Sequence, residues 1–152
     1  MAAGSFRYAL EMLLKQRRWQ QDAAAAQESS ARQALETRLE EARRAHDALA
    51  GLEHALREAR RAGAPIDARQ HEAASLYLAR ARQALRAKSK EAARAAEAHE
   101  RTREALARSV EAVRALEKHR AGRRREHERE QQSLAQQKHD ELWLTRRRFP
   151  WR

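Results

Sequence analysis

Seven histidines are the residues of this chain most suited to chemistry, because imidazole binds metals and transfers protons near neutral pH. A helix presents two metal ligands side by side when they are three or four residues apart. No two of the histidines have that spacing: they are His46, His54, His71, His99, His119, His127 and His139. We therefore expect surface or interface histidines and no metal site.

Other common catalytic patterns are also missing. The chain has no cysteine, so it offers neither a thiolate nucleophile nor a disulfide. Its four glycines form no phosphate-binding loop. The paired carboxylates Glu40 and Glu41 stand close to arginines, as on a solvated helix face. We predict a protein that is not an enzyme, needs no cofactor or metal, and works by contacting other molecules.

The composition indicates long helices. Of the 152 residues, 36% are charged and only 5% are aromatic, a balance typical of coiled coils and unlike that of globular cores. No stretch approaches the roughly 20 apolar residues that a spanning helix needs, and the first residues do not resemble a signal peptide. We expect an all-α chain without a transmembrane segment.

One short segment, GAPID at residues 63–67, interrupts the helical pattern. Glycine favours the position just after a helix, proline cannot continue one, and Asp67 can cap the next. With Gln70 three residues later, Asp67 resembles the first member of a capping box. A turn this short folds two helices back antiparallel.

Apolar residues on both sides of this turn recur with the seven-residue period of a coiled coil. In the first helix the a positions are Leu14, Gln21, Glu28, Leu35, Ala42, Leu49 and Leu56, and the d positions are Leu10, Arg17, Ala24, Ala31, Arg38, Ala45 and Leu52. In the second helix one heptad position holds Leu78, Leu85, Ala92, His99, Leu106, Val113 and Arg120, with Val110 and Leu116 beside it. The polar His99 in this row is the residue we expect to mark the register.

These signals predict a long two-helix antiparallel coiled-coil hairpin over residues 1–148. We expect helix 1 at about 6–61, the turn at 62–66, helix 2 at about 67–146 and a flexible tail at 147–152. Folding about Ala64 pairs residue i with about residue 128 − i. Helix 2 is the longer, so it overhangs helix 1 from about Gly122 onward.

The overhang is strongly basic. Residues 120–152 hold 10 Lys or Arg against 5 Asp or Glu, in a chain of formal charge +11. Such a surplus attracts nucleic acid, anionic lipid or an acidic protein, but acidic residues alternate with the first arginine cluster, which argues against a nucleic-acid groove. The residues expected to contact a protein partner here are Arg123, Arg124, Arg125, Leu134, Leu142 and Trp143.

A second cluster of apolar residues lies near the turn. It consists of Ile66, Leu76, Tyr77 and Leu78. Because consecutive residues of a helix point in different directions, they cannot all face one partner helix. We consider two roles, a thickened core at the turn or a docking surface for another protein.

Two stretches resemble a known family. Residues 6–17 read FRYALEMLLKQR, and residues 116–120 read LEKHR, followed by Arg123-Arg124, Glu126, Glu130 and Asp140-Glu141. Both are similar to the ends of the central-stalk proteins of flagellar and virulence type III secretion, the FliJ/YscO family. The expected hairpin agrees with that family over nearly the whole chain.

The resemblance implies a stalk that enters the pore of the hexameric secretion ATPase with its paired ends and promotes the activity of the ring. It implies that the turn faces the cytoplasmic domain of the export gate, that export chaperones are further partners, and that the protein is cytoplasmic and peripherally associated with the secretion apparatus at the inner membrane. The alternative is a basic helical nucleic-acid-binding protein or a scaffold coiled coil.

Overall fold

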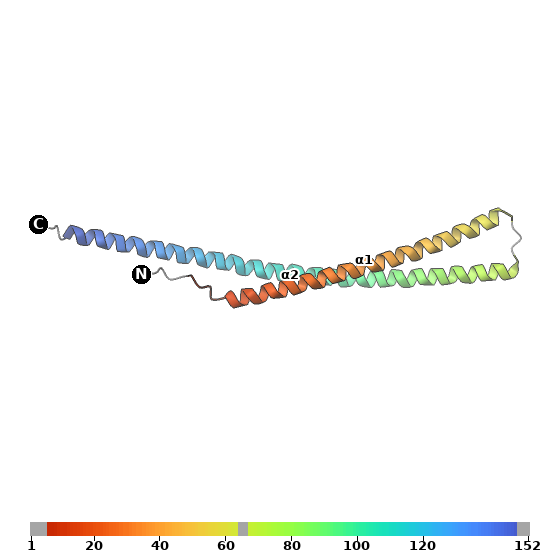
Figure 1. Cartoon of the computed structure of the whole chain (residues 1–152), viewed down its shortest axis with the longest axis horizontal. Coiled ribbons are helices and arrows are strands. Elements are labelled where there is room, and N and C mark those ends of the chain that lie inside the picture. The colour runs from red at the N-terminus through yellow and green to blue at the C-terminus, as the bar shows by residue number, and fades with distance from the viewer. Residues whose placement is uncertain (1–5, 64–66, 149–152) are drawn as a thin grey trace. The chain divides into compact units, whose positions relative to one another are not determined.

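The chain is an all-α hairpin of two long helices that pack against each other (Figure 1). The computed structural model describes residues 6–63 and 67–148, with side chains described as far as Thr145. Helix α1 spans Glu11–Arg61 and helix α2 spans Ala68–Arg148. The predicted fold class is therefore confirmed.

The helix ends differ in detail from the expected ones. Helix α1 begins at Glu11 and not at Phe6, because the backbone before it makes a turn in which the Glu11 amide donates to the Tyr8 carbonyl at 3.1 Å. Helix α2 continues through Gly122 and ends at Arg148, so Arg147 and Arg148 are helical. The remainder of the tail predicted at 147–152 lies outside the described residues.

The turn begins as the sequence predicts. Gly63 has φ of 66°, and its amide donates to the carbonyl of Arg60 at 3.3 Å, which is one of the two bonds of a Schellman ending. After the turn, the Asp67 carbonyl accepts the first helical bond from His71 at 3.0 Å, which places Asp67 at the N-cap position. Residues 64–66 lie outside the described part.

Contacts within the chain divide it into two units, each with part of α1 and part of α2. The turn unit is Ala23–Leu106, and the terminal unit is Met1–Asp22 with Ala107–Arg152. In both, the predicted a positions are partly or wholly buried. The predicted d positions of α1 are mixed: the three alanines are partly buried, whereas Leu10, Arg17, Arg38 and Leu52 are exposed.

The core is thin. Ala92 is the buried hydrophobic residue of the turn unit, and Tyr8, Leu14 and Val113 are those of the terminal unit, among the residues described. Leu14 is fully buried, which stabilises the fold by about 2 kcal/mol relative to leaving it in water. With so little apolar burial, polar contacts between the helices carry much of the specificity of the pairing.

Candidate interaction surfaces

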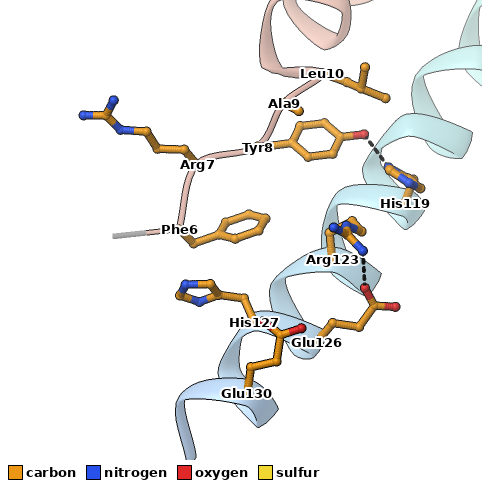
Figure 2. A pocket seen from close by; sticks show the side chains of 10 residues that line it. All are labelled: Phe6, Arg7, Tyr8, Ala9, Leu10, His119, Arg123, Glu126, His127 and Glu130. Atoms are coloured by element: carbon orange, nitrogen blue, oxygen red, sulfur yellow. Dashed lines mark hydrogen bonds and ion pairs between the residues drawn. The ribbon is translucent and has the colours of Figure 1, made fainter. Parts of the chain in front are cut away.

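An N-terminal arm, residues 6–10, lies along α2 in the terminal unit (Figure 2). Tyr8 anchors it: the ring is buried, and the hydroxyl donates to the carbonyl of Leu116 at 3.2 Å. The same hydroxyl lies 2.9 Å from Nδ1 of His119. The arm therefore carries the seam of the hairpin past the first residue of α1.

The Tyr8 hydroxyl thus lies within hydrogen-bonding distance of two groups on α2, one backbone carbonyl and one imidazole nitrogen. Because the hydroxyl has a single hydrogen and can also accept, it can bond both groups when the imidazole supplies the second hydrogen.

Phe6 makes a second aromatic contact two turns further along α2. Its ring centroid lies 5.6 Å from that of His127, at an interplanar angle of 56°. Between the arm and the helix is an open cavity of about 320 Å³, whose lining includes Phe6, Tyr8, His119 and His127. Arg7 points away from it (Figure 2). Phe6 and Tyr8 are two residues apart and both contact α2, as alternate residues of an extended segment can, whereas residues 9 and 10 belong to the turn before α1.

The three arginines of the first basic cluster differ in their surroundings. Arg123 pairs with Glu126 at 2.8 Å and Arg124 with Glu128 at 3.0 Å. These are exposed contacts within one helix. Arg125 is exposed and has no ion pair with any residue the structure describes. It is the most available cation of the cluster.

Beyond this cluster, every side chain from Gln132 to Thr145 is exposed. We call this segment, with the rest of α2 to Arg148, the α2 extension. Leu134, Leu142 and Trp143 are 49%, 62% and 57% exposed. The six residues predicted to form a contact surface thus lie on one helix of one unit, all of them at the surface.

The apolar residues near the turn do not form one surface. Ile66 lies outside the described residues. Tyr77 is 64% exposed and Leu76 is also exposed, whereas Leu78 is partly buried and lines a small cavity between the helices with Leu56. Leu78 therefore belongs to the seam, and Leu76 and Tyr77 form the outer surface of the turn unit.

Polar layers cross the seam of the turn unit. Lys88 lies 3.0 Å from Glu41 on the other helix and 3.3 Å from Glu91 on its own. Arg38 completes the layer with contacts to both carboxylates, at 2.9 Å and 3.1 Å. Hydrogen bonds from Lys88 and then from Arg38 lower the pKa of Glu41, and the bond to Glu41 raises the pKa of Lys88.

Two further ion pairs join the helices at equivalent heptad positions, one in each unit. Arg82 reaches Glu53 at 3.0 Å in the turn unit, and Arg18 reaches Glu117 at 2.7 Å in the terminal unit. Each of the four lies four residues after a member of the predicted heptad row of its helix, beside the seam, where charged pairs set orientation in coiled coils. The sequence showed the heptad positions of these charges but not their partners, because side chains this long reach several neighbours.

The residues described contain no group of three or more His, Cys, Asp or Glu side chains placed to hold a metal ion. Among them there is also no helix long and apolar enough to cross a membrane. Comparisons with known protein families, with curated proteins and with solved structures find nothing that matches the chain.

Proposed function

We propose that this protein is a non-enzymatic central stalk of a type III secretion system, which inserts into the hexameric secretion ATPase and promotes its activity. The observation that carries the proposal is the α2 extension. A helix that continues past its partner with basic and apolar side chains exposed all round fits the inside of a ring better than a flat surface. The resemblance of residues 6–17 and 116–120 to secretion stalks gives the same assignment.

In this proposal the ring contacts are Arg123, Arg124 and Arg125, followed along the helix by the exposed apolar residues of the extension. Arg125 is the strongest candidate because no described carboxylate neutralises it. Polar or acidic pore loops would be attracted to these cations. A stalk that favours the assembled, active ring typically contributes a coupling of about 1–3 kcal/mol, or roughly 5- to 150-fold.

The turn unit would link the ring to the export gate. Tyr77 and Leu76 present exposed apolar surface there, and an exposed aromatic residue is a common anchor of protein interfaces. Leu78 contributes to the seam and would support this surface from below. Export chaperones are further partners in this proposal, which places the protein in the cytoplasm at the inner membrane.

The test is ATP hydrolysis by the cognate secretion ATPase with and without the stalk. The triple variant R123Q/R124Q/R125Q should lose most of the stimulation. The matched control R43Q/R44Q/R57Q removes the same charge from exposed positions of the turn unit and should stimulate normally. Equal loss in both variants would show a general charge effect and contradict the proposal.

Two truncations separate the arginine cluster from the α2 extension. Ending the chain after Arg120 should leave most of the coiled coil and abolish stimulation, although it also removes the Phe6–His127 contact. Ending it after Gln131 keeps that contact and the three arginines, so partial stimulation is expected. Full stimulation by the shorter chain would exclude the α2 extension as the ring contact. Tight, salt-sensitive binding of random DNA without any effect on the ATPase would favour the nucleic-acid alternative instead.

A further inference from the structure

The two most exposed large apolar side chains that the structure describes lie on α1 in the terminal unit. Met12 is 76% exposed and Trp19 is 71% exposed. Successive residues of a helix are about 100° apart around its axis, so these two side chains lie within about 20° of each other and about 140–160° from Leu14. Because Leu14 is fully buried in the seam, Met12 and Trp19 share the opposite side of the helix, which we call the outer face of α1.

The spacing of these two residues indicates what covers them. Apolar residues scattered singly over a surface need no explanation, but these two are seven residues apart, or about 10.5 Å along the axis. That is one heptad, the repeat at which a helix contacts another helix packed lengthwise against it. A flat surface would also have to cover the polar side chains beside them, Lys15, Gln16 and Asp22, which are exposed. The outer face therefore fits another helix.

The charges beside this apolar pair specify the helix that covers it. Lys15 and Asp22 have opposite charge and lie seven residues apart on the same side of the outer face. Neither has an ion pair with a residue that the structure describes, whereas the nearby Arg18 is paired with Glu117 on α2. A helix on the outer face must therefore supply an acidic group for Lys15 and a basic group for Asp22.

A second copy of α1 supplies both groups. In an antiparallel pair of identical helices a two-fold axis relates the copies, so a contact of residue i with residue j is repeated as a contact of j with i. When Trp19 lies opposite Gln16 of the second copy, Lys15 lies beside Asp22 of the second copy, and the symmetric ion pair forms as well. The amide oxygen of Gln16 can accept the hydrogen of the Trp19 indole, and Met12 continues the apolar contact at both ends. A single register thus satisfies all of these groups.

We propose that the outer face of α1 binds the same face of a second copy of this chain in antiparallel orientation, through Met12 and Trp19 and through two reciprocal Lys15–Asp22 ion pairs. The formal charge of +11 on each chain opposes association at long range, but residues 11–22 hold three basic and two acidic residues. In about 0.15 M salt, charges more than about 8 Å apart are largely screened. A contact over about three helical turns is smaller than the roughly 1,600 Å² of a standard interface, so we expect a weak dimer that forms at high protein concentration.

This inference does not rest on the proposed stalk function. Self-association is measured without an ATPase, and stimulation of an ATPase is measured at concentrations where the chain is monomeric. Either result can therefore fail while the other holds.

The experiment is sedimentation equilibrium of the full chain from micromolar to millimolar concentration, over which the natural chain should change from monomer to dimer. Lys15→Glu and Asp22→Lys should each weaken the dimer on the order of tenfold, since each replaces two ion pairs by two pairs of like charge. The double variant K15E/D22K should dimerise like the natural chain. A mixture of the two single variants should form a heterodimer, because every pair across its interface is again opposite in charge. The control Lys90→Glu makes the same change of charge at an exposed position of the turn unit and should leave the dimer unchanged.

The apolar contact is tested separately from charge. Trp19→Ser keeps Lys15 and Asp22 and should weaken the dimer by about thirtyfold or more, as truncation of a tryptophan at the centre of an interface typically does. Tyr77→Ser, at an exposed aromatic residue of the turn unit, is the control and should have no effect. A chain that stays monomeric up to millimolar concentration, a dimer insensitive to both charge changes, as a parallel pair would be, or single variants that do not associate with each other would each overturn the proposal. Binding of Trp19 to phosphatidylglycerol vesicles in place of dimerisation would overturn it too.

Discussion

Nε2 of His99 lies 3.0 Å from Oε1 of Glu28 across the seam of the turn unit. Glu28 occupies a predicted a position and His99 lies in the predicted heptad row of the second helix. Their side chains are only about one-fifth exposed, at 21% and 20%. The predicted register places residue i opposite residue 128 − i. This pair departs from it by one residue, and so do Glu41 and Lys88. A polar contact at positions where apolar residues are expected favours this register over its neighbours.

The His99–Glu28 pair should influence specificity more than stability. Glu28→Leu or His99→Leu alone should destabilise the hairpin by about 1–2 kcal/mol, because each leaves a partly buried polar group without its partner. The double variant should be as stable as the natural chain or more so. Thermal unfolding followed by circular dichroism measures these changes.

The exposed pair of His46 and Asp47, 3.3 Å apart and 68% accessible on both sides, provides the control. His46→Leu should change stability by less than about 0.5 kcal/mol. A double Glu28 and His99 variant that is no more stable than either single one would contradict the proposed role of the pair.

Glu41 should make the stability of the turn unit depend on pH in the acidic range. Its pKa lies below the ordinary 4.5, mainly because Lys88 and Arg38 donate hydrogen bonds to it. A carboxylate with a lowered pKa contributes stability that is present above the unfolded value and is lost as the pH falls through the folded one. The difference in free energy of unfolding between the natural chain and Glu41→Gln should therefore shrink as the pH falls below 4.5.

The matched variant for this experiment is Glu40→Gln. Glu40 contacts Arg44 on its own helix at 3.2 Å, and this contact does not join the two helices. The difference in free energy of unfolding between the natural chain and Glu40→Gln should therefore be small at every pH. Urea unfolding at several pH values measures both differences. A difference for Glu41→Gln that stays constant down to pH 3 would show that the charged layer contributes nothing through ionisation.

The sequence was sufficient to predict the seam, for a simple physical reason. A repeat of seven residues fixes one face of a helix whatever the chemistry of its members. Even the polar members of the predicted a row, Gln21 and Glu28, are therefore partly buried, whereas Arg17 and Arg38 of the predicted d row are exposed. The turn was predictable for a similar reason, because few residues other than glycine adopt the positive φ seen at Gly63.

Other features depend on contacts between residues far apart in the chain. The arm was predicted as helix, since nothing local shows that Tyr8 bonds to residues more than 100 positions away. Near the turn, the heptad row already placed Leu78 on the face of the partner helix, whereas nothing local shows what the exposed Leu76 and Tyr77 contact. In the first basic cluster, the pairing of Arg123 and Arg124 but not Arg125 depends on side-chain conformations.

The arm should owe its position to the Tyr8 hydroxyl. Tyr8→Phe keeps the ring but removes the bonds to Leu116 and His119, and should destabilise the terminal unit by about 1 kcal/mol. Tyr77→Phe, at an exposed site, is the control and should be neutral. Hydrogen exchange of the amides around Leu116 measures the effect. Unchanged protection there in Tyr8→Phe would show that ring packing alone holds the arm.

Two glycines should respond in opposite directions to the same substitution, although neither would bring a new Cβ within 4 Å of another group. Gly63 has φ of 66°, where an L-residue with a side chain is strained, so Gly63→Ala should destabilise the hairpin by about 1–2 kcal/mol. Gly51 lies inside α1, where alanine is the better helix former, so Gly51→Ala should stabilise it by about 1 kcal/mol. Because the added atom is identical and both sites are open, packing cannot account for a difference in sign. Thermal unfolding of the two variants therefore measures the backbone contribution directly. If Gly63→Ala stabilised the hairpin, residue 63 would not need the positive φ that it has after the end of α1.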